Sequence, residues 1–277
     1  DFCLSRGLGD VYKRQIVRYG KVTAEMMDAA PSLRVISKHG SGTDTIDKTA
    51  AAARGIEVVA AAGANAAAVA EQALALMLAC AKSVVPLNAR VHAGQWDKAT
   101  HKGVELGSRT VGLLGLGAIG RRFAASVQVL GMRVLAYDPY AQEAPEGVTL
   151  VPLATLWRES DVLSLHCPLT DENRELIDAE VLAQCKRGVI LVNTARGGLI
   201  DEAALLQAVR SGQVMAAGLD SFAVEPIAPD HPFLGEPGFV LSPHIGGVTG
   251  DAYVNMGVAA ARNLLDVLAR QPSPQSA

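Results

Sequence analysis

The 277-residue sequence contains no run of lysine or arginine, and its formal net charge is −3. This balance argues against nucleic acid as the main partner. No apolar stretch approaches the ~20 residues that a membrane span requires, so no membrane association is expected. The four cysteines show neither C-x-x-C nor zinc-binding spacing. We therefore expect reduced thiols, a cytoplasmic location and no bound metal.

The first fifteen residues, DFCLSRGLGDVYKRQ, differ from the rest of the chain. They show no apolar periodicity and no signal-peptide pattern, and a strand pattern starts abruptly at Ile16. We interpret residues 1–15 as a non-native scar of translated adapter sequence, to be left out of the fold. On this interpretation the native N-terminus is missing, and the first domain lacks its opening strand–helix units.

From Ile16 onward, short apolar runs alternate with helical segments, a pattern that indicates parallel sheets covered by helices on both faces. A long helix is predicted over 66–92, apolar on most faces of its first half. We expect a smaller domain formed by 16–81 and 248–277, and a nucleotide-binding domain over 82–247. The predicted strands are 16–19, 34–37 and 57–60 in the smaller domain, and 110–114, 133–137, 162–166, 189–193, 216–219 and 239–241 in the larger one.

A glycine-rich turn lies between the strand at 110–114 and the helix that follows it. Its sequence is Gly115-Leu116-Gly117-Ala118-Ile119-Gly120. The strand–turn–helix context predicts a dinucleotide site, with tight turning at the first glycine, close approach of pyrophosphate at the second and helix packing at the third. Asp138 follows about twenty residues later, at the end of the next strand. A carboxylate there binds ribose hydroxyls and repels a 2′-phosphate, so NAD is predicted as the cofactor.

Three further polar residues follow later strands, each framed by turn-forming residues. They are Arg196 in NTARGG, Glu225 in VEP and His244 in SPH. A guanidinium fork suits a carboxylate, an imidazole can give or take a proton near neutral pH, and a carboxylate can fix the imidazole tautomer. Taken singly, each could be a surface or structural residue. Their joint occurrence on a βα scaffold favours hydride transfer to a 2-keto acid.

Through these motifs the sequence resembles the D-isomer-specific 2-hydroxyacid dehydrogenases, especially D-3-phosphoglycerate dehydrogenases and hydroxypyruvate/glyoxylate reductases. The matching segments, in the order that the family shows, are KHGSGTDTID, GLGAIGR, YDP, HCPLT, VNTARGGLIDE, LDSFAVEP and SPHIGG. The resemblance implies a doubly wound, parallel-sheet Rossmann domain for NAD. It also implies a smaller flavodoxin-like α/β substrate domain, here incomplete at its N-terminus, and a homodimer built partly by the helix that begins near Ala66.

The resemblance also implies roles for individual residues. Arg196 would bind the substrate carboxylate, Glu225 would orient the histidine and His244 would be the acid/base. Gly40, Ser41 and Gly42 would bind substrate with Arg196. The cofactor would contact Ser41, Gly115, Gly117, Ala118, Ile119, Gly120, Asp138, Cys167, Thr194, Ala195, Asp220, Gly246 and Gly247. His166 is expected to be structural. His39, His92, His101 and His231 show no partner pattern, so solvated or packing roles are expected for them.

These features predict an NAD-dependent oxidoreductase that interconverts a small D-2-hydroxy acid and its 2-keto acid. The substrate would be of the hydroxypyruvate/glyoxylate or 3-phosphoglycerate type, and the sequence does not choose between them. An alternative on the same scaffold is an NAD(H)-sensing, corepressor-like binding protein. The complete Arg/Glu/His set favours catalysis over that alternative.

Overall fold

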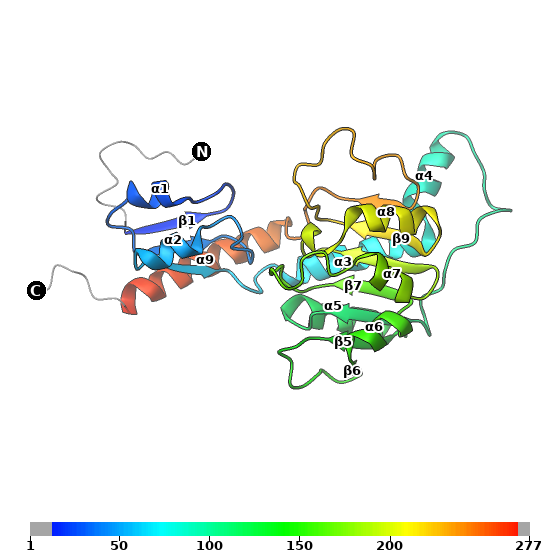
Figure 1. Cartoon of the computed structure of the whole chain (residues 1–277), viewed down its shortest axis with the longest axis horizontal. Coiled ribbons are helices and arrows are strands. Elements are labelled where there is room, and N and C mark those ends of the chain that lie inside the picture. The colour runs from blue at the N-terminus through cyan, green and yellow to red at the C-terminus, as the bar shows by residue number, and fades with distance from the viewer. Residues whose placement is uncertain (1–12, 271–277) are drawn as a thin grey trace, which may run out of the picture. The chain divides into compact units, whose positions relative to one another are not determined.

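A computed structural model describes residues 13–270, which divide into two compact units. The smaller unit holds a three-stranded parallel sheet in the order β1-β2-β3, formed by β1 (Arg14–Val17), β2 (Val35–Lys38) and β3 (Glu57–Ala60). Its helices are α1 (Ala24–Asp28), α2 (Lys48–Ala53) and α9 (Gly250–Arg270) (Figure 1). Strand β1 begins at Arg14, two residues before the strand start predicted at Ile16. Residues 1–12 and 271–277 lie outside the described residues.

Alternation along β2 explains how this small sheet is covered on both faces. Ile36 packs with α1 and α2 residues such as Met27 and Ala51, whereas its neighbour Val35 packs against Leu264 and Val267 of α9. Successive side chains of a strand point to opposite faces, so one strand serves both layers. The Ser37 hydroxyl adds a buried hydrogen bond of 2.8 Å to the Ala260 carbonyl of α9.

The larger unit holds a seven-stranded sheet in the order β10-β9-β8-β7-β4-β5-β6, with every neighbouring pair parallel. The strand order reverses between β4 and β7, the crevice at which doubly wound sheets bind nucleotides. The doubly wound fold class predicted from the sequence is therefore confirmed. The strands are β4 (Thr110–Leu114), β5 (Arg133–Tyr137), β6 (Val148–Leu150), β7 (Val162–Leu165), β8 (Val189–Asn193), β9 (Val214–Leu219) and β10 (Phe239–Leu241).

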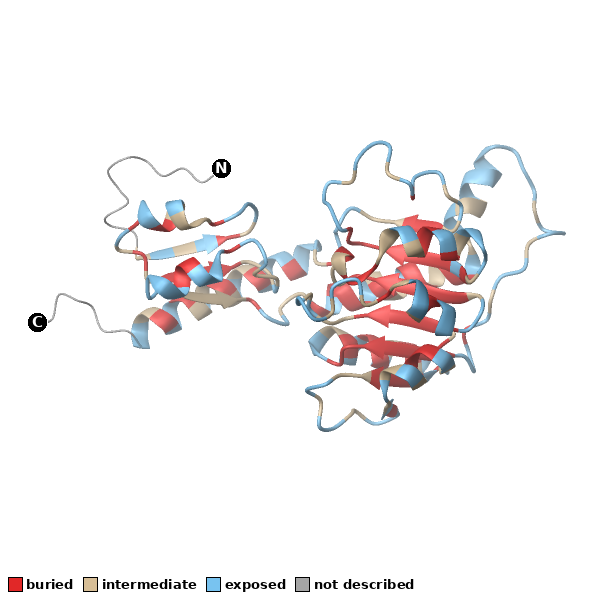
Figure 2. Ribbon diagram, viewed as in Figure 1, coloured by how far each residue is buried: buried red, intermediate tan, exposed pale blue. Residues whose placement is uncertain are grey.

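Helices cover both faces of this sheet, and its central strands β4, β7 and β8 are buried along their whole length (Figure 2). One face packs against α3 (Ala66–Lys82) and α5 (Ala118–Val129). The other packs against α6 (Leu153–Glu159), α7 (Ala179–Gln184) and α8 (Glu202–Arg210). Since α3 contacts α5, β8 and β9, the larger unit begins at Ala66 and not at the predicted boundary near residue 82.

The helix predicted over 66–92 is two helices, α3 and α4 (Val84–His92), bent by 62°. Ser83 between them adopts a left-handed conformation, with φ 52°. Pro86 explains the break: in a continuous helix its ring would clash with the Lys82 carbonyl, and it has no N–H to bond there. In the first turn of a new helix, proline is tolerated. No single helix within 13–270 is long and apolar enough to cross a membrane; α3 and α4 reach that length only together.

Candidate active site

The glycine turn follows β4 at the crevice where the strand order reverses. Gly115 has φ +100°, and a Cβ there would lie 2.8 Å from the Cys167 amide nitrogen, so only glycine fits. Gly120 packs against the Gly115 carbonyl, which leaves no room for a side chain. A Cβ on Gly117, by contrast, would meet no protein atom within 4 Å. This backbone is open to close approach at the N-terminus of α5, where the amides of Ala118 and Ile119 begin the helix, so it fits a pyrophosphate.

Asp138, the residue after β5, lies beside this turn. Its Oδ2 accepts a hydrogen bond of 2.8 Å from the Leu116 amide, and its Oδ1 accepts one of 2.9 Å from the Tyr140 amide. Each carboxylate oxygen has a second lone pair, so these bonds fix the carboxylate and leave it able to accept from ribose hydroxyls. The position fits the predicted discrimination between NAD and NADP.

His166 and Cys167, the two residues after β7, pack against the glycine turn at Gly115. Burial raises the pKa of the Cys167 thiol to about 11, so the side chain is a neutral thiol near pH 7. Burial lowers the pKa of His166 to about 3, and 2.9 Å separates its Nε2 from the Ser164 hydroxyl, to which it is hydrogen-bonded. His166 is therefore a neutral structural residue, and the backbones of His166 and Cys167 both border the turn at Gly115.

Arg196 is held by its own turn after β8. The side chain of Asn193, fully buried at the strand end, accepts from the Ala195 amide at 2.9 Å and donates to the Arg196 carbonyl at 2.8 Å. The Arg196 Nη1 donates to the Ala195 carbonyl at 2.7 Å, which orients the guanidinium plane. The Thr194 hydroxyl is buried with no hydrogen-bond partner among the described residues, which fits a polar ligand group at that point.

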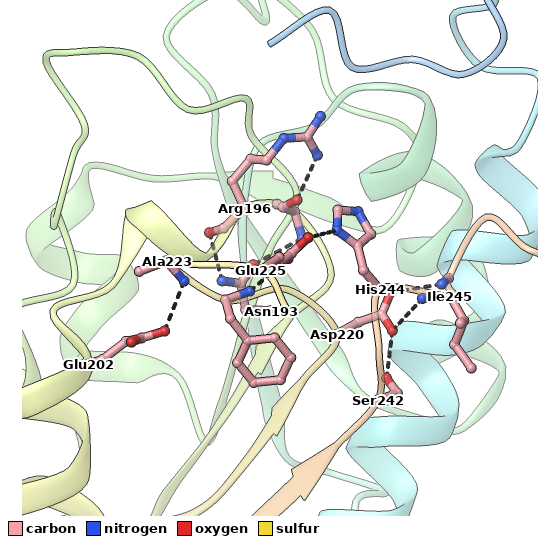
Figure 3. Close-up of polar contacts among 12 residues, drawn as sticks. Asn193, Arg196, Glu202, Asp220, Ala223, Glu225, Ser242, His244 and Ile245 are labelled. Atoms are coloured by element: carbon pink, nitrogen blue, oxygen red, sulfur yellow. Dashed lines mark hydrogen bonds and ion pairs between the residues drawn. The ribbon is translucent and has the colours of Figure 1, made fainter. Parts of the chain in front are cut away.

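His244 and Glu225 form a hydrogen-bonded pair, with 2.8 Å between Nδ1 and Oε2 (Figure 3). Glu225 Oε1 accepts a second bond of 2.9 Å from the Phe222 amide. The bond to Glu225 raises the pKa of His244 above its ordinary value, although partial burial works against this. Partial burial raises the pKa of Glu225, but the bonds from His244 and Phe222 outweigh it, and the net pKa is lowered. With Nδ1 engaged and the ring 45% exposed, Nε2 is the nitrogen suited to proton transfer.

Asp220, at the end of β9, anchors the segment that carries His244. Its Oδ1 accepts from the Ser242 hydroxyl at 2.6 Å and from the Ile245 amide at 2.9 Å, and its Oδ2 accepts from the Gly246 amide at 2.7 Å. Asp220 is 1% exposed. These bonds hold His244 in a left-handed conformation, φ 53°, that is unusual for a bulky residue. The predicted contact of Asp220 with the cofactor stays a prediction.

The structure thus brings Arg196, Glu225, His244 and Asp220 together at the carboxyl ends of β8, β9 and β10 (Figure 3). The charge of Arg196 favours ionisation of Glu225 and opposes protonation of His244, so the three groups interact. The glycine turn, Asp138 and Cys167 lie at the carboxyl ends of β4, β5 and β7. Gly40, Ser41 and Gly42, which follow β2, belong to the smaller unit, as does Gly247.

Sequence reasoning missed four residues of this site. Asn193 has no predicted role of its own, although an Asn at a strand end before a turn is a signal for side-chain bonding to the backbone. Ser242, whose hydroxyl bonds Asp220, likewise has no predicted role. His231 has a partner after all, since its Nε2 lies 3.3 Å from Glu202 Oε2. Nothing local marks Glu202 or His231, because the two residues are distant in sequence. Within residues 13–270, no three His, Cys, Asp or Glu side chains form a group that could hold a metal ion.

Comparisons with known proteins agree with this geometry. Residues 74–246 match the family described as "D-isomer specific 2-hydroxyacid dehydrogenase, NAD binding domain". The chain is 43% identical over 250 residues to the hydroxypyruvate reductase of Thermotoga maritima, covering 90% of this chain and 82% of that protein. It is 42% identical over 260 residues to the D-3-phosphoglycerate dehydrogenase of Archaeoglobus fulgidus, covering 92% of this chain but 49% of that one. The chain therefore spans about half the length of that dehydrogenase.

Two solved structures are similar over most of their length. The TT0316 protein of Thermus thermophilus superposes with a TM-score of 0.86 at 38% identity, covering 96% of this chain and 86% of that chain. A glyoxylate reductase from Paecilomyes thermophila gives a TM-score of 0.87 at 32% identity, with coverages of 95% and 83%.

Proposed function

Because the chain belongs to the D-isomer-specific 2-hydroxyacid dehydrogenases, a family of NAD-dependent oxidoreductases, we propose that it interconverts a small D-2-hydroxy acid and its 2-keto acid. The proposed substrates are of the hydroxypyruvate/glyoxylate type, with 3-phosphoglycerate as the second candidate. The observation that carries the proposal is the 2.8 Å bond between His244 and Glu225 beside Arg196. The alternative of an NAD(H)-sensing corepressor is not supported, since these relatives are named as reductases and dehydrogenases.

In the proposed reduction of a 2-keto acid, Arg196, His244 and Glu225 have separate roles. Bound NADH supplies the hydride that adds to the carbonyl carbon of the 2-keto acid. The Arg196 guanidinium binds the substrate carboxylate and polarises the neighbouring carbonyl. Protonated His244 gives its Nε2 proton to the carbonyl oxygen, which becomes the hydroxyl, and is left neutral. Ionised Glu225 holds Nδ1–H and stabilises the charged ring before the transfer.

Further cofactor and substrate contacts belong to the proposal. The Gly115–Gly120 turn with Ala118 and Ile119 would hold the pyrophosphate, and Asp138 the ribose. The groups proposed to face the nicotinamide side are Thr194, Ala195, Asp220 and Gly246. In the smaller unit, Ser41 and Gly247 are proposed to contact the cofactor, and Gly40, Ser41 and Gly42 the substrate.

We also propose a homodimer and a cytoplasmic location. Apolar side chains that favour a partner lie on and after α4: Val84, Val85 and Val91 are each at least half exposed, and Trp96 is 79% exposed. Cys80, Cys167 and Cys185 are free thiols, in keeping with a reducing compartment.

A substrate screen tests the proposed function. The protein is mixed with NADH and with hydroxypyruvate, glyoxylate or the phosphorylated 2-keto acid of 3-phosphoglycerate, and the loss of NADH absorbance is followed. Turnover of at least one of them is expected. Tight NADH binding without turnover of any 2-keto acid would reject a dehydrogenase and favour a sensor.

Replacement of Glu225 by glutamine is expected to move the pH dependence of keto-acid reduction. Reduction needs protonated His244, and Glu225 raises the pKa of His244, so activity persists to higher pH in the wild type and is lost as pH rises through that raised pKa. Glutamine carries no charge, so the alkaline limb of kcat/KM should move down by about one pH unit. The matched control is Glu159→Gln, on α6. An unmoved alkaline limb in Glu225→Gln would contradict the assigned pairing.

Replacement of Asp138 by asparagine is expected to weaken the preference for NADH. The change removes the negative charge that repels a 2′-phosphate but keeps an oxygen to accept from the Leu116 amide. We expect KM for NADH to rise about tenfold and the NADPH/NADH ratio of kcat/KM to rise by a similar factor, about 1.4 kcal/mol of discrimination. Asp171→Asn, whose side chain is 99% exposed, is the control. An unchanged cofactor ratio would remove Asp138 from the ribose site.

A further inference from the structure

A second carboxylate–histidine pair, Glu202 and His231, contacts the segment that carries Glu225. Glu202, the first residue of α8, accepts a hydrogen bond of 2.9 Å from the Ala223 amide through Oε1 (Figure 3). Its other oxygen, Oε2, lies 3.3 Å from Nε2 of His231. The two carboxylate oxygens of Glu202 are therefore used separately, one for the backbone of this segment and one for the histidine.

The environment of His231 keeps this pair in place. The ring packs edge-on against Phe233, with 4.8 Å between centroids, and against Phe222, with 6.2 Å. The side chain of His231 is 15% exposed and that of Glu202 is 25% exposed. A pair shielded to this degree is screened less than one on an open surface. The aromatic contacts also leave the imidazole little freedom to turn away from the carboxylate.

The segment Phe222–Glu225 is thereby fixed from two sides. Its consecutive amides each bond a carboxylate, Phe222 to Glu225 and Ala223 to Glu202. On the other side, Gly197 of the Arg196 turn packs so closely on the Phe222–Ala223 backbone that a Cβ would overlap it. Gly197 lies in the connection between β8 and α8, and Glu202 is the first residue of α8. The same stretch of chain therefore carries Arg196 and holds the segment that presents Glu225.

From these contacts we propose that Glu202, oriented by His231, is a positioning residue that fixes the Phe222–Glu225 segment and so the carboxylate that orients His244. The inference rests on the proposed function for its effect on turnover. Glu202 touches neither substrate nor cofactor in this scheme; it acts through the backbone of Ala223. Supporting interactions of this kind set the precision of a catalytic group, and small displacements are costly in rate.

The test compares Glu202→Ala with the wild type in two measurements. Steady-state kinetics should show kcat for keto-acid reduction about tenfold lower, with KM for NADH unchanged. An NMR titration of the histidine rings in the ligand-free protein should show the pKa of His244 moved down toward its ordinary value, because the Glu225 bond that raises it is less well held. The other charged groups that act on His244, Arg196 and Asp220, are the same in both proteins.

Three more variants separate positioning from a loss of stability. Glu202→Gln keeps an oxygen for the Ala223 amide and should stay within about twofold of the wild-type kcat. His231→Phe keeps the aromatic packing but loses the bond to Glu202, and should lower kcat about threefold even if Glu202→Ala does not fold. Glu159→Ala, a glutamate that pairs with Arg133, should be unchanged.

A folded Glu202→Ala with wild-type kcat and a wild-type His244 titration overturns the proposal, whatever its melting temperature. Equal losses in Glu202→Gln and Glu202→Ala would also overturn it, because the Ala223 bond would then not be the cause. If the wild type turns over no 2-keto acid, the proposed function fails, while the His244 titration still decides the inference.

Discussion

Replacing His244 with alanine is expected to lower kcat for keto-acid reduction by about 10²- to 10⁴-fold, the range typical for loss of a general acid. The ring is the only proton donor that the proposed mechanism places at the carbonyl oxygen, and the bond from Glu225 keeps it protonated to higher pH than a free histidine. Without it the alkoxide must take its proton from water. The measurement is the steady-state rate of NADH oxidation with the best substrate of the screen.

NADH binding separates this effect from damage to the fold. Asp220 holds the segment around His244 through Ser242 and the amides of Ile245 and Gly246, none of which uses the imidazole. The dissociation constant of NADH, followed by its fluorescence, should therefore change less than about threefold. His101→Ala, between α4 and β4, is the matched control. Turnover in His244→Ala close to that of the wild type would mean that another group supplies the proton.

The sheet of the larger unit was largely predictable because its strands are continuous apolar runs bounded by turn residues. Strands β4, β5, β8 and β10 have the predicted bounds. Strand β6, three residues long, carries too short a pattern to be predicted. Helix α3 is apolar on most faces, so periodicity did not show which unit it packs with, and the boundary fell too late. The break at Ser83 was visible in Pro86, but alanine- and valine-rich flanks continued the helical pattern across it.

The principal residues of the candidate site were predictable from the sequence, but the hydrogen bonds that position them were not. Arg196, Glu225 and His244 stand in turns after strands, and parallel strands bring such turns to one edge. Their supports depend on pairs distant in sequence, such as Asp220 with Ser242 and Glu202 with Ala223. A hydrogen bond between segments becomes visible only when the fold places them together. The left-handed conformation of His244 has the same origin, since no local residue requires it.

Replacing Arg196 with lysine is expected to lower kcat/KM for the 2-keto acid by about 10²-fold, roughly 3 kcal/mol, although the charge is kept. A guanidinium offers a planar fork that can bind both carboxylate oxygens, whereas an ammonium is a point donor. The bond from Nη1 to the Ala195 carbonyl already orients that plane in the structure. Lysine cannot make this bond and bind the carboxylate with the same geometry, so KM for the keto acid should rise and kcat should fall.

The matched control is Arg187→Lys, whose guanidinium donates to the Ser211 carbonyl near the start of β8, at the opposite end of that strand from Arg196. This variant also replaces a guanidinium by an ammonium, but at a position away from the site, so its kcat/KM should equal that of the wild type. KM for NADH should be unchanged in both variants, since neither side chain belongs to the cofactor contacts. A kcat/KM for Arg196→Lys within about threefold of wild type would show that a positive charge alone suffices at this position. Two-oxygen binding of the substrate carboxylate would then have to come from another residue.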